Sequence, residues 1–214
     1  WRRNETFFLS LWHKTTPSKD AQMILLRRVA MFCVGTVTAI ALVGASLPRQ
    51  WLVIRRVTIA APPERIHPFV VSLQQWPEWT AWNKSMDPQL RITYEGSPEG
   101  VGSRKIWVGP ELGHGLIELT SVDLQEGIRY NAAIAGEIVN GGGSILYKRL
   151  NNATEVEWTD EGRLPPIVGG FVRWSIESNL TVAIDKSLAT LKGLVEASKP
   201  TVIPQTDRSR RRSP

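Results

Sequence analysis

The sequence predicts an α+β fold, in which a curved antiparallel sheet of about seven strands wraps around a long C-terminal helix and one transmembrane helix precedes the sheet. Three observations predict it. An uncharged run fills residues 29–47, strand-like segments separated by turn residues fill residues 51–161, and an apolar stripe at helical spacing runs through residues 168–198. A meander of short strands followed by one helix is typical of an α+β domain.

The first predicted element is a membrane-spanning helix. Residues 29–47 (VAMFCVGTVTAIALVGASL) hold nineteen residues without a charge, directly after Arg27 and Arg28. This length is close to what a helix needs to cross a bilayer, so we expect an uncleaved single-pass anchor. The alternative is a signal peptide cleaved after the Val-Gly-Ala sequence at residues 43–45. If Met23 were the true start, the signal-peptide interpretation would gain weight.

Basic residues around this segment do not orient it. Of the basic residues within about twenty positions, four precede it and four follow it, namely Lys14, Lys19, Arg27 and Arg28 before it and Arg49, Arg55, Arg56 and Arg65 after it. The positive-inside rule therefore gives a tie. We expect a single-pass protein of a bacterial-type cytoplasmic membrane, with the soluble domain on the extracytoplasmic side; the opposite side stays open at this point.

The formal net charge of +6 is concentrated at the two ends of the chain. The N-terminal basic arm, residues 1–28, carries +4, and residues 199–214 carry another +4, which leaves −2 for the rest. A slightly acidic globular part lacks the broad basic face that nucleic-acid binding needs, so we expect no nucleic-acid partner. Residues 198–214 are predicted to be a disordered basic tail. The single cysteine, Cys33, excludes a disulfide within the chain.

The soluble domain, residues 51–197, begins with a strand and two short helices. Residues 51–60 alternate and are rich in β-branched side chains, which predicts a strand. The Ala-Pro-Pro-Glu sequence at residues 61–64 ends this strand and begins a helix that extends to about residue 73, with proline in the first turn. Pro77 interrupts the next short segment, residues 75–82.

Six further strands are predicted between residues 90 and 161. Breaks rich in glycine or asparagine separate them, and we interpret the Gly-Gly-Gly sequence at residues 141–143 as a hairpin turn. The predicted strands are residues 90–95, 102–108, 115–122, 129–137, 144–150 and 155–161.

The last predicted element is a long helix over residues 168–198. Its apolar stripe consists of Leu180, Ile184, Leu188, Leu191 and Val195. The stripe must be buried, and the concave face of the curved sheet is the partner available to it. A curved sheet closed by a helix leaves an internal cavity unless large side chains fill it.

Several short sequences give this domain a family resemblance. They include the PPERIHPFVVSLQQWPEWTAWN segment with its Trp-Pro-x-Trp-x-x-Trp pattern (Trp76, Pro77, Trp79 and Trp82), Gly-Val-Gly at residues 100–102 before a strand containing Trp107, and Thr-Glu-Val-Glu-Trp at residues 154–158. Over about residues 55–197 the chain resembles the SRPBCC superfamily of helix-grip folds, which includes START lipid-transfer domains and birch-allergen-like proteins, and in particular its polyketide cyclase/dehydrase branch. Many members of that branch carry an N-terminal anchor.

The resemblance implies an apolar cavity that holds a hydrophobic small molecule or lipid, without fixing a reaction. Aromatic side chains at inward or rim positions are the candidate ligand contacts. An alternative role for the tryptophans at residues 76–82 is a plug that closes one end of the domain. The candidate ligand-binding residues are Trp79, Trp82, Trp107, Tyr130, Tyr147, Trp158, Phe171 and Trp174.

Residues suited to catalysis are few. Glu118 is a candidate acid or base if it points inward, and His114 is another at a glycine turn; a solvated position is the simpler interpretation of both. No catalytic set with serine, histidine and aspartate can be assembled from spacing, and no Cys/His metal spacing or phosphate-binding loop is present. We therefore assign no catalytic residue, metal or cofactor.

Three functions stay open at this point. The favoured one is a membrane-anchored module that binds or carries a hydrophobic small molecule or lipid. The second is an enzyme of the polyketide cyclase/dehydrase type, which would need a proton-transfer group inside the cavity. The third is a structural membrane protein whose cavity is filled by its own side chains.

Overall fold

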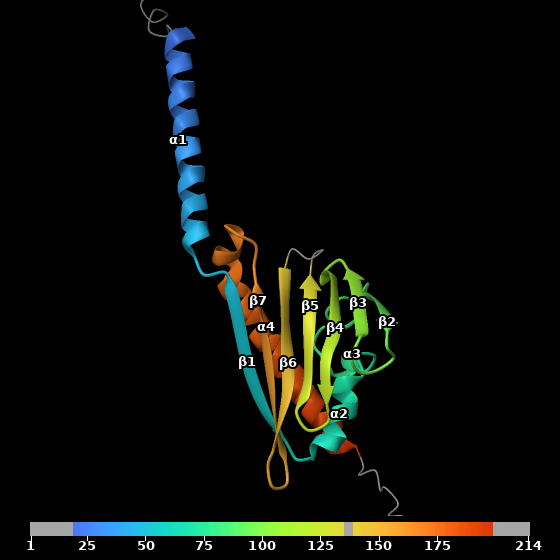
Figure 1. Cartoon of the computed structure of the whole chain (residues 1–214). Helices are drawn as coiled ribbons and strands as arrows, with labels where there is room; N and C mark the ends of the chain where they lie inside the picture. Colours follow the sequence, from blue (N-terminus) through green and yellow to red (C-terminus); the bar gives the residue numbers. More distant parts are fainter. Residues whose placement is uncertain (1–18, 135–138, 199–214) are drawn as a thin grey trace, which may run out of the picture.

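A curved seven-stranded antiparallel sheet dominates the computed structural model, which describes residues 19–134 and 139–198 (Figure 1). Its strand order is β1-β7-β6-β5-β4-β3-β2, so the chain returns after β6 to place β7 beside β1. The predicted fold class is confirmed. The strands are β1 (Gln50–Ile59), β2 (Arg91–Gly96), β3 (Ser103–Gly109), β4 (Gly113–Asp123), β5 (Gly127–Ile134), β6 (Val139–Arg149) and β7 (Thr154–Arg163).

Helices α2 (Pro63–Val71), α3 (Trp76–Trp79) and α4 (Val168–Ala197) cover the concave face of this sheet (Figure 1). The second half of α4 buries Ile184, Leu188, Leu191 and Val195, as the apolar stripe predicts. Two indole N–H groups hold α3 against the end of α2. Trp76 Nε1 donates to the Val70 carbonyl at 2.9 Å and Trp79 Nε1 to the Phe69 carbonyl at 3.0 Å, which satisfies acceptors that a helix end leaves free.

One predicted turn is wrong. The glycines at residues 141–143 lie inside β6 rather than in a hairpin turn, paired with β5 on one side and β7 on the other. The connection between β5 and β6 falls at residues 135–138. These residues are outside the described part of the chain, as are residues 1–18 and the tail from residue 199 onward.

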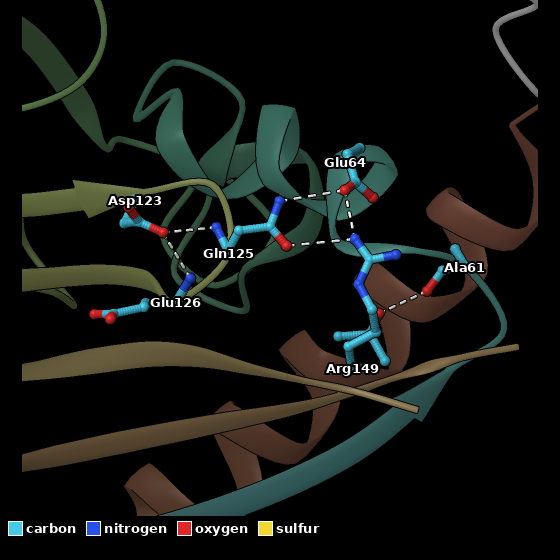
Figure 2. Close-up of polar contacts among 7 residues, drawn as sticks. Ala61, Glu64, Asp123, Gln125, Glu126 and Arg149 are labelled. Atoms are coloured by element: carbon cyan, nitrogen blue, oxygen red, sulfur yellow. Dashed lines mark hydrogen bonds and ion pairs between the residues drawn. The ribbon is translucent and has the colours of Figure 1, made fainter. Parts of the chain in front are cut away.

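The hydrophobic core fills the interior at the end of the domain far from α1. There, α2, α3 and the second half of α4 cover the sheet, the core is mainly apolar and aromatic, and Ser72, Thr154 and Ser187 are buried beside it. Polar contacts close the same end (Figure 2). Arg149 of β6 pairs with Glu64 of α2, and Gln125 in the β4–β5 turn donates to Glu64 at 3.3 Å. These contacts tie three elements together at the packed end.

Helix α1 (Lys19–Ser46) precedes the sheet and extends away from it (Figure 1). It begins before the predicted residue 29, because the helix continues through the charged residues that flank the apolar run. Residues 22–46 are long and apolar enough to cross a membrane, and a signal sequence would share that property. The end of α1 contacts the start of α4. A side chain at Gly44 would lie 2.7 Å from the Phe171 ring, and Leu47 lies against Gly170.

Candidate functional site

A cavity of about 310 Å³ lies between the sheet and the first half of α4. Its lining comes from the start of β1, the facing ends of β5 and β6, the end of β7, the middle of β3 and β4, and Ile176 and Leu180 of α4. These segment ends lie at the side of the domain from which α1 extends (Figure 1). The packed half and the hollow half of the interior are therefore opposite ends of one domain.

Glycines on the sheet leave the space that aromatic rings occupy. A methyl group at Gly141 would lie 2.8 Å from the indole of Trp51, and one at Gly143 would lie 2.6 Å from the Tyr130 hydroxyl. Trp107 lies over Gly115 in the same way. The run of glycines in β6 thus lets large side chains lie flat against the sheet. Aromatic rings therefore form the floor of the cavity above the glycines at residues 141–143 of β6.

A cluster of aromatic rings separates the cavity from the packed half. Trp76 contacts Trp79, Tyr130 and Trp158 at ring-centroid distances of 5.5 to 6.0 Å, with tilted or edge-on geometry. Trp82 makes a similar contact with Trp158 at 5.9 Å. Such pairs add to the stability that burial alone provides. This cluster forms the wall of the cavity that faces the packed half.

A hydrogen-bond network runs through this wall. Asp160 accepts hydrogen bonds from Trp51 Nε1 and from the Tyr130 hydroxyl, each at 2.8 Å, and the Tyr130 oxygen accepts one from Trp158 Nε1 at 2.9 Å. Burial raises the pKa of Asp160 above its usual value although both donors lower it. Burial also raises the pKa of Tyr130. The Tyr130 proton is held by Asp160, so this hydroxyl is not free to serve a ligand.

Two polar side chains on the cavity lining have no such partner. Lys105 of β3 is only 4 % exposed, and among the described residues it forms no hydrogen bond or ion pair. Burial lowers the pKa of this lysine to about 8. The Thr80 hydroxyl is buried and also lacks a hydrogen-bond partner in the described structure. Unpaired polar groups of this kind are uncommon in protein interiors.

The structure places the eight predicted ligand contacts in three groups. Trp82, Trp107, Tyr130 and Trp158 line the cavity. Trp79 and Tyr147 are buried in the core outside the lining, and Tyr147 faces His67 of α2, with its hydroxyl 3.5 Å from Nδ1. Phe171 and Trp174 are exposed on α4, at 51 % and 77 %, beyond the lining.

Glu118 and His114, the acid or base candidates, lie on β4 away from the cavity. Glu118 accepts a hydrogen bond from Arg104 Nε at 3.0 Å on the outer face of the sheet. His114 is exposed at the start of β4. Neither residue is among the cavity-lining side chains.

Sequence reasoning missed four lining residues that carry polar atoms, namely Trp51, Thr80, Lys105 and Asp160. A signal for Lys105 was available. It stands two positions before Trp107, which was predicted to point inward, and strand alternation places both on one face. Among the described residues, no group of three side chains suited to metal binding comes together.

Comparisons with known proteins agree with this geometry. The profile of the family described as "Polyketide cyclase / dehydrase and lipid transport" matches residues 50–196. No curated protein shows significant sequence similarity to the chain.

Three solved structures illustrate the shared fold. Ara h 8.0201 has a TM-score of 0.51 and 14% identity, over 70% of this chain and 99% of its own. A protein from Thermus thermophilus has a TM-score of 0.53 and 21% identity, over 68% and 97%. The di-domain ARO/CYC StfQ of the steffimycin biosynthetic pathway has a TM-score of 0.54 and 9% identity, over 69% of this chain and 51% of its own.

Proposed function

Because this chain belongs to the polyketide cyclase/dehydrase and lipid transport family, we propose that it is a membrane-anchored module that binds or carries a hydrophobic small molecule or lipid in its internal cavity. The observation that carries this proposal is the cavity of about 310 Å³, which apolar and aromatic side chains line. Its size is at the lower end of what small-molecule sites enclose. The protein's own side chains leave this space open, which argues against a purely structural role.

Filling the cavity tests this proposal directly. Ala132 of β5 lines the cavity, with Ile117 and Gly141 beside it on β4 and β6. We expect Ala132→Phe to weaken binding of an apolar fluorophore such as Nile red by about tenfold or more, because each Å² of lost apolar contact is worth about 25 cal/mol. Fluorescence titration of the full-length protein measures this change.

The neighbouring alanine supplies a matched control. Ala133 pairs with Leu116 and Asn140 on the opposite face of the sheet, so Ala133→Phe adds the same bulk outside the cavity. It should leave fluorophore binding unchanged. Equal binding by both variants and the wild type would contradict the cavity as the binding site. Separately, native mass spectrometry of gently purified protein would identify a ligand carried from the cell.

The proposal that the protein is membrane-anchored is supported by α1 and by the exposed apolar side chains beside the C-terminal end of this helix. Val168, Phe171 and Trp174 are exposed apolar side chains at the start of α4. Phe171 lies beside the end of α1 at Gly44. Tryptophan and other aromatic side chains favour the membrane–water interface. If α1 spans the bilayer, these side chains and the cavity lie at the membrane-proximal end of the domain, where an apolar ligand can exchange with lipid.

Charges inside α1 should release the protein from membranes. We expect the double variant Val34→Arg and Ile40→Arg to move from the carbonate-washed membrane pellet to the soluble fraction, because each arginine at the centre of a span costs about 2.5–3.5 kcal/mol. Val182→Arg makes the same change at an exposed position of α4 and should stay in the pellet.

A mature protein whose mass corresponds to cleavage after Ala45 would contradict the anchor and establish a signal peptide. A compartment-specific reporter fused to the C-terminus then decides between the extracytoplasmic side, which we propose, and the cytoplasmic side.

The enzyme alternative has less support from the geometry. A cyclase or dehydrase needs a proton-transfer group that reaches the ligand. Glu118 lies on the outer face, and the Tyr130 hydroxyl already donates to Asp160. If turnover of a poly-keto substrate survived both Glu118→Gln and Tyr130→Phe, those two residues would have no role in proton transfer.

A further inference from the structure

The cavity lining contains one buried cation without a partner. Lys105 shares this lining with aromatic and aliphatic side chains, and no carboxylate among the described residues pairs with it. Aligned with Lys105 on the neighbouring strands are Tyr94 of β2 and Ile117 of β4, which carry no negative charge at neutral pH. Asp160, the carboxylate on the lining, is instead held by Trp51 and the tyrosine hydroxyl of β5. The charge of Lys105 therefore has no direct partner in the described protein.

A buried charge without a partner is costly, so its presence needs a reason. A lysine that served only to fill space would be replaced by methionine or leucine with a gain in stability. Thr80 gives a second, independent observation, since this residue also belongs to the cavity lining and its buried hydroxyl has no hydrogen-bond partner in the described structure. Both groups can donate a hydrogen bond. They are therefore suited to a ligand that brings acceptor oxygens into an otherwise apolar space.

On the basis of the proposed function, we infer that the ligand is an apolar molecule with a single carboxylate. Lys105 binds this carboxylate, and Thr80 donates a further hydrogen bond to it. The remaining lining then holds the apolar body of the ligand. The lowered pKa of Lys105 agrees with this role, because burial without a neighbouring anion is its cause. A bound carboxylate would restore the charged form.

A matched pair of probes tests the inference on the full-length protein in nanodiscs of zwitterionic phospholipid. Dodecanoic acid and dodecanol share the same apolar chain, and only the acid carries a carboxylate. Displacement of Nile red gives an apparent affinity for each. The measured quantity is the affinity for the acid divided by the affinity for the alcohol. We expect this ratio to be about tenfold or more higher for the wild type than for the Lys105→Met variant, since hydrogen bonds between charged groups add about 1.5–3 kcal/mol. Partition into the discs is the same for all variants and cancels when this ratio is compared between them.

Two variants keep the comparison specific. Lys148→Met removes an exposed lysine on the outer face of β6 and should retain the preference for the acid. Thr80→Val should weaken binding of the acid by a smaller factor and leave the contribution of Lys105 in place. If Lys105→Met failed to fold by circular dichroism, Lys105→Gln would replace it, because it also lacks the charge.

The outcomes separate this inference from the proposed function. If the wild type and the Lys105→Met variant bind both probes with the same ratio, the carboxylate inference is wrong and the apolar cavity site stands. If neither probe displaces Nile red from the wild type, the inference is overturned as well. If Nile red itself fails to bind, the proposed function falls with it.

Discussion

Replacing Asp160 with alanine should lower the free energy of unfolding by about 2–4 kcal/mol, because it leaves two buried donors without an acceptor. Asp160 accepts hydrogen bonds from Trp51 Nε1 and the Tyr130 hydroxyl, and both donor residues line the cavity. A buried donor that loses its acceptor costs about 1–3 kcal/mol. Urea denaturation of the full-length protein in nanodiscs, followed by tryptophan fluorescence, measures the change.

Two further variants show whether the network causes this loss. Asp160→Asn keeps the size of the side chain and one acceptor oxygen, so it should lose about half as much stability. Glu161→Ala removes the next carboxylate along β7, which is exposed on the opposite face, and should change stability by less than about 0.5 kcal/mol. Equal losses for Asp160→Ala and Glu161→Ala would mean that general charge, rather than the hydrogen-bond network, accounts for the effect.

Most of the fold could be predicted from the sequence, because the spacing of apolar residues and the positions of turn residues are local signals. Alternation located the first strand and turn residues separated the other six, while the spacing of Ile184, Leu188, Leu191 and Val195 predicted the buried face of α4. The glycines at residues 141–143 were misassigned for a physical reason. Glycine favours turns in an isolated segment, and only the pairing of β6 with its neighbours shows that aromatic rings from β1 and β5 occupy the space above it.

The site was less predictable, because the placement of side chains around a cavity depends on long-range packing. Alternation placed Trp107, Tyr130 and Trp158 inside the domain, where they line the cavity. It could not separate Tyr147, which points into the packed end, from residues at the hollow end. Lysine is seldom buried, so its residue type gives no reason to expect Lys105 inside, although its spacing of two from Trp107 on the same strand indicates an inward position. Polar residues inside an apolar domain are thus the least predictable and the most informative.

Replacing Lys105 with methionine should raise the free energy of unfolding by about 1–3 kcal/mol at pH 7. In the folded protein the pKa of this lysine is about 8, against 10.5 in an unfolded chain, and each pKa unit corresponds to about 1.4 kcal/mol. Because the folded state binds the proton more weakly, the lysine destabilises the fold fully below pH 8. This cost decreases as the pH rises from 8 toward 10.5. Denaturation at pH 7 and at pH 9.5 compares the variant with the wild type.

The pH dependence separates this effect from better packing by methionine. If the charge causes the difference, the stability gap between Lys105→Met and the wild type should narrow by about half between pH 7 and pH 9.5. A gap that stays constant over this range would assign the gain to packing alone. Lys148→Met, at an exposed position, should show no gap at either pH. A residue that costs stability at neutral pH yet remains in the cavity is best explained by the ligand it binds, because stability alone would favour its loss.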